Sequence, residues 1–228
     1  MRRSRCCCGI DFFLPPAAET RKGTLSAVSR DVSTVPSSRE SSLALTFDDG
    51  PDPNGTPKLL ASLTRLGARA TFFPIAARAA AHPDLIERML RDGHCVGVHC
   101  DQHVRHSERQ AGWVRRDTER ALSLLRSVGV SPTLWRTPWG EHAPFSADIA
   151  RHHGLQIIGW TVDTHDWRGD SAETMFASVE SGLRDGAVVL AHDGIGPGAG
   201  RSSVDQTIAL VELVAEHARR TGLALEAL

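Results

Sequence analysis

Apolar runs alternate with amphipathic segments from residue 41 to the end of the chain. The apolar runs have the length of strands and cover residues 43–47, 70–75, 95–98, 134–135, 156–162, 187–191 and 223–227. Helical spacing of apolar residues predicts helices over 57–66, 82–92, 108–128, 147–153, 172–183 and 204–220, several of which end at glycine. Strands separated by helices are typical of βαβ units. The pattern therefore predicts one α/β domain built on parallel strands.

Residues 1–40 lack any apolar period and contain scattered Ser, Thr and Pro. We expect a flexible N-terminal tail here and place the domain at residues 41–228. Arginines near the start are followed by an apolar stretch that Asp11 interrupts and Pro15 ends. Because a signal peptide needs a longer unbroken apolar core, we expect a cytoplasmic protein rather than a secreted one.

Composition excludes several classes of protein. With 41% hydrophobic and 23% charged residues, the 228-residue chain has ordinary globular usage and is not disordered or fibrous. No run reaches the 18 or so apolar residues of a membrane span. A net charge of −1 gives no sign of the basic face that nucleic-acid binding requires. The sequence shows no protein partner either, so the polar residues at the strand ends become the centre of interest.

Five predicted strands end in side chains that can do chemistry. Because the carboxyl ends of parallel strands meet at one edge, we expect these side chains to gather at one site. They are Asp48 and Asp49, His99 and His103, the segment from Arg136 to Gly140, the segment from Asp163 to Trp167, and His192.

One aspartate and two histidines form a set that suits a metal ion. His99 and His103 are four residues apart, which places both on one side of a helical turn. Together with Asp49 they provide the three protein ligands of a catalytic zinc site, with a position left for water or substrate. We expect one divalent ion, Zn²⁺, with Co²⁺, Ni²⁺ and Fe²⁺ as alternatives. The plainer alternative is two exposed histidines on a helix beside a solvated Asp-Gly turn.

These strand ends resemble the five ordered motifs of the polysaccharide deacetylase family, the NodB homology domain of carbohydrate esterase family 4. The motifs are Thr46-Phe47-Asp48-Asp49-Gly50, His99-xxx-His103, Arg136-x-Pro138-Trp139-Gly140, Asp163-xx-Asp166-Trp167 and Leu190-x-His192. The resemblance covers residues 41–228 and implies a distorted (β/α) barrel of about seven parallel strands. It also implies metal-dependent hydrolysis of N-acetyl groups on GlcNAc-containing oligosaccharides or polysaccharides, of the chitooligosaccharide or peptidoglycan type.

The resemblance implies a role for each matched residue. The aspartate and two histidines already described match the metal ligands. Asp48 matches the general base, and Arg136 matches the residue that pairs with that base. His192 matches the general acid that protonates the leaving amine, and Asp166 matches the carboxylate that orients this acid.

Four further residues match the part of the family site that contacts substrate. Trp167 and Leu190 match the lining around the acetyl methyl group. The backbone N–H of Trp139 matches an oxyanion donor, and Asp163 matches a supporting carboxylate. Cys100 departs from the family, which usually has Ser or Thr there, hydrogen-bonded to shape the loop. Since a thiol is a weaker donor, we expect the loop to be less rigid.

Four histidines that match no role in the family are expected at the surface or the rim of the site, namely His94, His106, His142 and His165. Cys95 is expected to pack as a small buried hydrophobe.

Three alternatives to an N-deacetylase remain. An O-acetyl esterase acting on acetylated xylan would use the same groups, because amide and ester hydrolysis share a tetrahedral intermediate. A non-catalytic carbohydrate-binding relative would be expected to lose the base, the acid or a ligand, whereas Asp48 and His192 are both present. A magnesium-dependent phosphoryl-transfer enzyme would need a Gly-rich phosphate cradle, which the sequence lacks.

Overall fold

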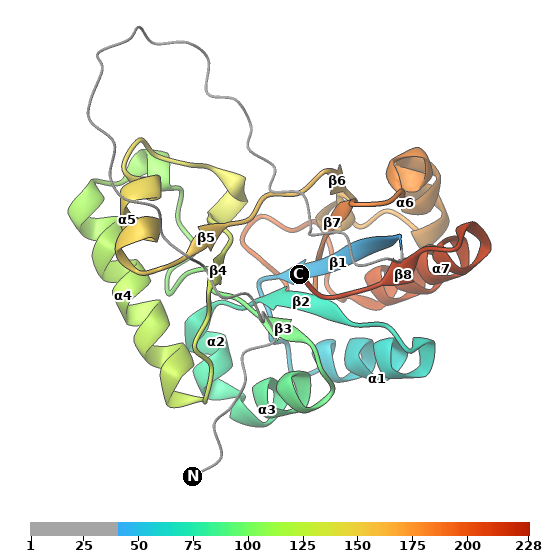
Figure 1. Cartoon of the computed structure of the whole chain (residues 1–228), viewed down its shortest axis with the longest axis horizontal. Coiled ribbons are helices and arrows are strands. Elements are labelled where there is room, and N and C mark those ends of the chain that lie inside the picture. The colour runs from blue at the N-terminus through green and yellow to red at the C-terminus, as the bar shows by residue number, and fades with distance from the viewer. Residues whose placement is uncertain (1–40) are drawn as a thin grey trace, which may run out of the picture.

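A computed structural model describes residues 41–228 (Figure 1). The predictions of a flexible tail and of an absent export signal concern residues 1–40 and lie outside the described residues. The strands are β1 (Ser42–Asp48), β2 (Ala70–Phe73), β3 (Cys95–Val96), β4 (Leu134–Trp135), β5 (Gln156–Ile157), β6 (Val162–Asp163), β7 (Val188–His192) and β8 (Ala224–Leu225). The α-helices are α1 (Thr56–Leu66), α2 (Ala76–Ala81), α3 (Pro83–Arg91), α4 (Ala111–Ser127), α5 (Ser146–His152), α6 (Ala172–Val179) and α7 (Asp205–Thr221). Short 3₁₀ turns are η1 (His106–Glu108), η2 (Pro138–Gly140), η3 (Asp166–Arg168) and η4 (Glu180–Gly182).

The strands pair in parallel, which confirms the predicted α/β class. The main sheet has the order β3-β2-β1-β7-β6, and β8 pairs with the start of β1. The register between β1 and β7 places Asp48 directly opposite His192. A second sheet of β4 and β5 joins through a bridge between Val98 and Trp135. The curved sheet is therefore continuous from β6 round to β5, and no ladder among the described strands joins β5 to β6.

The single strand predicted over 156–162 is wrong, because two short strands stand in its place. The backbone N–H of Ile158 donates to Trp135 on β4, whereas that of Thr161 donates to Val188 on β7. The chain thus changes partner strand between these residues. The carbonyls of Ile158 and Gly159 accept hydrogen bonds from the side chain of Arg136 instead. This opening in the sheet is where a buried guanidinium enters the wall of the site.

Helices surround the sheet (Figure 1). Leu59, Leu60 and Leu63 of α1 are fully buried against the core, as their helical spacing predicts. Pro57 occupies the first turn of α1, and Gly67 ends the helix in a left-handed conformation with φ 65°. α2 was not predicted, because its sequence of alanines and one arginine has no amphipathic period. The packed helices hold β1 in the middle of the molecule, where its end can carry a rigid site.

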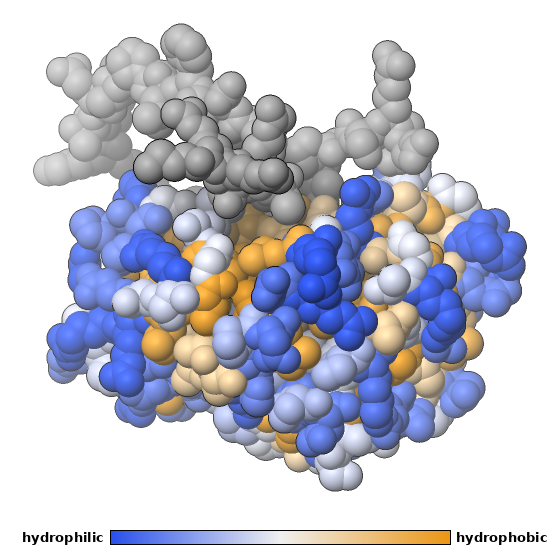
Figure 2. Space-filling view, turned by 90° about the horizontal axis from the view of Figure 1, so that it is seen from below, coloured by the Kyte–Doolittle hydropathy of each residue, from blue (hydrophilic) through white to orange (hydrophobic). Residues whose placement is uncertain are grey.

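Figure 2 shows one face with hydrophilic side chains around its margins and apolar side chains between them. None of the helices within residues 41–228 has the length and apolar character needed to cross a membrane.

Leu63→Ala tests the helix packing against a matched substitution, Leu90→Ala. Leu63 is fully buried, whereas Leu90 is 38% exposed. We expect Leu63→Ala to lower the free energy of unfolding by about 2–5 kcal/mol, because it removes buried methyl groups and leaves a cavity. Leu90→Ala should change it by about 0.5 kcal/mol or less. Urea denaturation of both variants checks this, and equal losses would contradict the described packing.

Candidate active site

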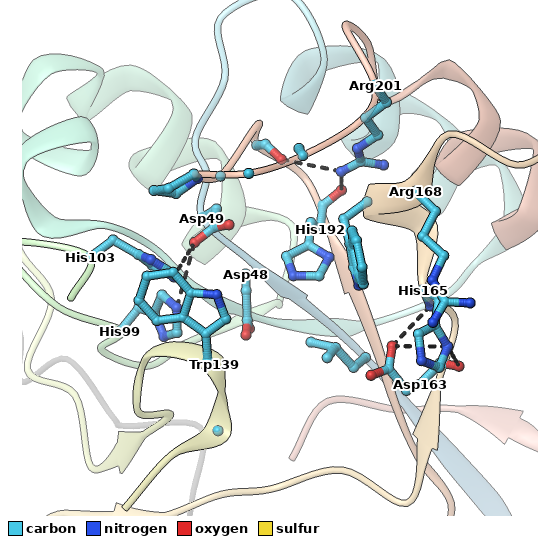
Figure 3. Close-up of a pocket in the computed structure, with 18 of the residues that line it drawn as sticks. Asp48, Asp49, His99, His103, Trp139, Asp163, His165, Arg168, His192 and Arg201 are labelled. Carbon is cyan, nitrogen blue, oxygen red and sulfur yellow. Dashed lines mark hydrogen bonds and ion pairs between the residues drawn. The ribbon is translucent and has the colours of Figure 1, made fainter. Parts of the chain in front are cut away.

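A pocket of about 470 Å³ opens at the carboxyl ends of the strands (Figure 3). Nine of the eleven site residues singled out in the sequence line it, namely Asp48, Asp49, His99, His103, Trp139, Asp163, Trp167, Leu190 and His192. The other two, Arg136 and Asp166, lie behind the wall and contact Asp48 and His192. The topology thus brings the five strand ends together at one edge, as predicted.

Asp49, His99 and His103 form one cluster that can hold a metal ion. Their ligand atoms all lie within 4.8 Å of one another, and no other such group of ligands occurs within residues 41–228. Oδ1 of Asp49 lies 3.5 Å from Nε2 of His99 and 3.3 Å from Nε2 of His103. Nδ1 of His99 donates to the carbonyl of Arg136 at 2.6 Å, which leaves Nε2 free to bind a metal. Cys100 is buried outside this cluster.

The charge balance of the cluster fits a cation. Oδ1 of Asp49 is buried and has no hydrogen-bond partner among the described residues. Burial raises the pKa of Asp49, despite the opposing effect of His99. Burial, with repulsion from His99 and His192, lowers the pKa of His103 to about 3, so its imidazole is neutral as a metal ligand must be. A divalent cation would compensate the buried carboxylate and accept both imidazoles.

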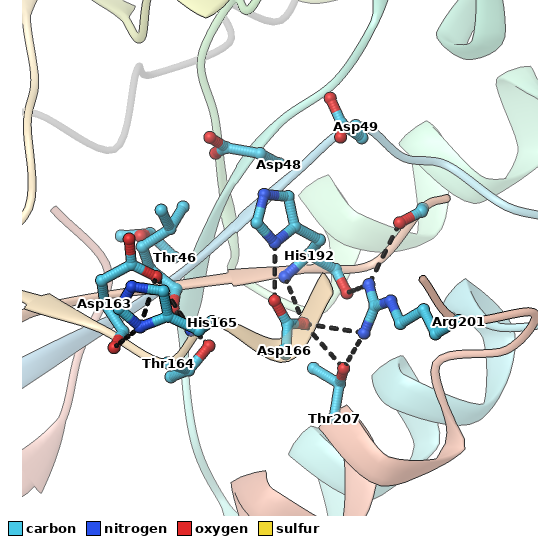
Figure 4. A network of polar contacts seen from close by, with 12 residues as sticks. Thr46, Asp48, Asp49, Asp163, Thr164, His165, Asp166, His192, Arg201 and Thr207 are labelled. Atoms are coloured by element: carbon cyan, nitrogen blue, oxygen red, sulfur yellow. Dashed lines mark hydrogen bonds and ion pairs between the residues drawn. The ribbon is translucent and has the colours of Figure 1, made fainter. Parts of the chain in front are cut away.

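Asp49 is fixed by its backbone. Its φ of 72° is left-handed, so the chain turns sharply after β1 and separates the side chain of Asp49 from that of Asp48 (Figure 4). Arg78 donates to the carbonyl of Asp49 at 2.8 Å and to that of Ile195 at 2.9 Å. The loop that carries Ile195 also passes close to the side chain of Asp49. Only glycine fits at position 196, since a Cβ there would lie 2.0 Å from Oδ2 of Asp49. Sequence reasoning missed these contacts, because neither Arg78 nor the glycine loop belongs to a motif.

Asp48 forms a buried ion pair with Arg136. Nη1 of Arg136 lies 3.0 Å from Oδ1 of Asp48 and donates to Oγ1 of Thr46 at 2.7 Å. The guanidinium is fully buried, and its carbon lies 4.4 Å from the centre of the Phe73 ring. Burial lowers the pKa of Arg136, and Asp48 acts in the opposite direction. The pair orients the side chain of Asp48 toward the pocket.

His192 belongs to a second buried network (Figure 4). Its Nδ1 lies 2.7 Å from Oδ1 of Asp166, whose Oδ2 accepts from the backbone N–H of His192 at 3.0 Å. The same oxygen accepts from Arg201 at 2.8 Å and from Thr207 at 2.7 Å. Arg201 also donates to the carbonyl of His192 at 3.0 Å. Arg201 and Thr207 were missed, because no local pattern links them to Asp166.

The network stabilises the charged form of His192. Burial lowers its pKa, but the Asp166 carboxylate, helped by Asp48 and Asp49, outweighs this and raises the pKa to about 9. Burial acts against the charge of Asp166 too, yet His192 and Arg201 hold the pKa of Asp166 below its usual range. At neutral pH the pocket therefore presents an imidazolium opposite the Asp48 carboxylate.

Two tryptophans stand at the mouth of the pocket. Trp139 and Trp167 are 38% and 40% exposed, and the guanidinium carbons of Arg105 and Arg168 lie over their rings at 4.5 and 5.2 Å. The centres of the Trp139 and His103 rings lie 4.1 Å apart. Leu190 is buried in the wall. The pocket thus combines charged groups inside with apolar rings at its entrance.

Asp163 is placed differently from the other carboxylates. Its Oδ1 accepts from the backbone N–H of His165 at 2.9 Å, so it closes a turn at the rim. His165 lies at the rim as expected, but the surface positions expected for His94 and His106 are wrong, because both are buried. His94 packs against Phe72 and accepts from a backbone N–H, and apolar surroundings of this kind gave no signal in the sequence.

Comparison with known proteins identifies the family. A sequence profile described as polysaccharide deacetylase matches residues 36–158, which is more than half of the chain. The chain belongs to the polysaccharide deacetylase family. The resemblance inferred from the five motifs is thereby confirmed.

Individual members of the polysaccharide deacetylase family agree with this. The chain is 37% identical over 185 residues to a chitooligosaccharide deacetylase of Bradyrhizobium sp., covering 80% of this chain and 84% of that protein. It is 32% identical over 185 residues to a peptidoglycan-N-acetylglucosamine deacetylase of Bacillus cereus, with the same coverage of each. A family 4 carbohydrate esterase from Streptomyces lividans, solved in complex with acetate, superposes with a TM-score of 0.73 and 29% identity. That match covers 81% of this chain and 91% of the solved one.

Gly196→Ala tests the placement of Asp49. The new Cβ would collide with Oδ2 of Asp49, so we expect the affinity for Zn²⁺ to fall about 10- to 100-fold, as for other contacts that orient metal ligands. Gly159→Ala is the matched control, since a Cβ there meets nothing within 4 Å. Zinc titration against a chelating dye measures both. Unchanged affinity in Gly196→Ala would show that the loop does not constrain Asp49.

Proposed function

We propose that the chain is a metal-dependent hydrolase that removes N-acetyl groups from GlcNAc-containing oligosaccharides or polysaccharides. The observation that carries this is the pairing of Asp48 and His192 across β1 and β7, a carboxylate and an imidazolium in one pocket beside the candidate metal ligands. The similar proteins named as chitooligosaccharide and peptidoglycan deacetylases support the proposal. So does acetate, the product of such a reaction, in the similar esterase structure.

Asp49, His99 and His103 would hold the metal, and their donor set favours Zn²⁺. When bound there, such an ion supplies a Lewis acid that polarises the amide carbonyl and makes water more acidic. Asp48 then accepts the proton of the attacking water. Arg136 keeps this carboxylate pointed into the pocket, since its guanidinium is itself held by Thr46 and a backbone carbonyl.

His192 would act on the other side of the acetamide. The amine of the sugar is a poor leaving group until its nitrogen is protonated, so the reaction needs a positioned acid as well as a base. The bond from Nδ1 to Asp166 leaves Nε2 of His192 to carry the transferable proton. The pKa of about 9 keeps that proton in place at neutral pH. This favours an amide substrate over an acetyl ester, whose leaving alcohol needs the acid less.

The remaining pocket residues would position the substrate. We propose that Leu190 and Trp167 surround the acetyl methyl group and that the backbone N–H of Trp139 stabilises the developing oxyanion. The exposed rings of Trp139 and Trp167 at the mouth offer flat apolar surfaces to a sugar. We assign Asp163 a supporting role at the rim, through the turn that it closes.

Acetate release from N-acetylated chitooligosaccharides tests the proposed function. We expect release by zinc-loaded protein, none after chelation, and a loss of kcat of about 10²- to 10⁴-fold in Asp48→Asn and in His192→Ala. His142→Ala is the matched histidine control, because this exposed residue lies outside the pocket and should keep full activity. Peptidoglycan and acetylated xylan complete the substrate panel. Metal-dependent release from xylan alone would contradict an N-deacetylase.

The pH dependence tests the acid. Because His192 must be protonated to act, kcat/KM of the wild-type enzyme should fall as the pH rises through about 9. Asp166→Asn removes the charge that raises the pKa of His192, so the alkaline limb should move to lower pH. Asp163→Asn, which removes a pocket carboxylate that does not contact His192, should leave the limb in place. An alkaline limb that is the same in Asp166→Asn and in wild type would exclude His192 as the acid.

A further inference from the structure

The two histidines of the metal cluster are oriented in different ways. His99 is fixed by a hydrogen bond from its Nδ1 to the carbonyl of Arg136. Nδ1 of His103 is buried but has no hydrogen-bond partner among the described residues. Its ring packs against the rings of His99 and Trp139, with 5.0 and 4.1 Å between ring centres, and Trp139 is itself partly exposed. The position of His103 therefore depends on the backbone of the loop between the two histidines.

The backbone of that loop is hydrogen-bonded to a carboxylate of α4. Oδ2 of Asp117 accepts from the backbone N–H of Asp101 at 3.1 Å, and Oδ1 accepts from that of Gln102 at 2.9 Å. Asp117 is only 7% exposed, and its bond to Asp101 is buried, whereas its bond to Gln102 is partly buried. One helical turn later, Arg120 pairs with the carboxylate of Asp101 at 2.9 Å. Both carboxylate oxygens of Asp117 thus accept hydrogen bonds from the two residues immediately before His103.

We infer that Asp117 is a positioning residue for the metal site, which fixes the loop so that Nε2 of His103 faces Asp49. The inference rests on the proposed metal site and adds a residue outside the five motifs. Hydrogen bonds to a charged acceptor are stronger than those between neutral groups, and two on adjacent amides restrain the loop in two directions. The sequence predicted a less rigid loop because Cys100 replaces the usual Ser or Thr. Asp117 of α4 would supply the restraint that this hydroxyl gives in the family.

The restraint is separable from the packing of α4. The helix is anchored in the core by apolar side chains, among them Val114, Ala121, Leu122 and Leu125. The carboxylate of Asp117 instead points to the loop backbone. A substitution that keeps the shape of the side chain should therefore disturb the loop more than the helix.

Asp117→Asn in the full chain tests the inference. The amide keeps one acceptor oxygen but turns an NH₂ group toward the other backbone N–H, so one bond is replaced by a repulsion between donors. We expect the affinity for Zn²⁺, measured against a chelating dye without substrate, to fall about 10- to 100-fold. Saturating zinc should restore most of kcat and leave KM unchanged, because the ligands and the pocket are intact. An affinity within twofold of wild type would overturn the inference.

Thr118→Val is the matched control. Thr118 is the next residue of α4, is also buried, and donates its hydroxyl to the carbonyl of Val114 in the same helix at 2.9 Å. We expect zinc affinity within twofold of wild type, together with some loss of stability. A loss of affinity as large as that of Asp117→Asn would mean that any damage to α4 has this effect, which would overturn a specific role for Asp117.

Hydrogen exchange on the zinc-free wild-type protein tests the same point without a variant, should Asp117→Asn fail to fold. The amides of Asp101 and Gln102 should exchange much more slowly than exposed loop amides, because both are bonded to a buried carboxylate. Fast exchange of both amides would overturn the inference.

Asp49→Ala distinguishes a failure of this inference from a failure of the proposed function. Undiminished zinc affinity in Asp49→Ala would overturn the metal site itself, whereas a failure to release acetate would leave the zinc measurements on Asp117 valid.

Discussion

The parallel register between β1 and β7 is the constraint on which the site depends. Backbone hydrogen bonds set Asp48 directly across from His192, at the ends of two neighbouring strands in the middle of the sheet. The left-handed turn at Asp49 then separates the side chains of two adjacent aspartates. One faces a guanidinium and the other faces two imidazoles. If β7 were shifted by one residue along β1, the side chains of β7 would turn to the opposite face of the sheet, and His192 would no longer face Asp48.

Two buried arginines hold the opposing groups of the pocket in place. Arg136 pairs with Asp48, and Arg201 supports Asp166, which in turn pairs with His192. A buried charge is costly unless it is paired and hydrogen-bonded, and both guanidiniums also donate to backbone carbonyls or a threonine hydroxyl. Nε of Arg201 alone among these donors has no hydrogen-bond partner within the described residues. The result is a carboxylate and an imidazolium that coexist in one pocket. Hydrolysis of an amide needs such a combination of base and acid.

The sequence predicted the parallel α/β class and the side chains at the strand ends, since short-range pattern and topology determine both. The sequence did not predict the features that depend on tertiary contacts. The partner switch between Ile158 and Thr161 breaks a run of residues that looks like one strand. Arg201 is 35 residues from Asp166, and Asp117 is 16 from Asp101, so no spacing rule connects them. Arg78, Arg201 and Asp117, which hold the site residues through long-range contacts, are therefore the part of the site that the structure adds.

The metal centre is tested most directly by anomalous X-ray scattering at the zinc edge from crystals of the zinc-loaded full chain. We predict one strong peak at the carboxyl end of β1, bonded to a carboxylate oxygen of Asp49 and to Nε2 of His99 and His103. Zinc bound at another place, such as a cysteine sulfur, with this cluster empty, would contradict the assignment of the site and the chemistry proposed for it.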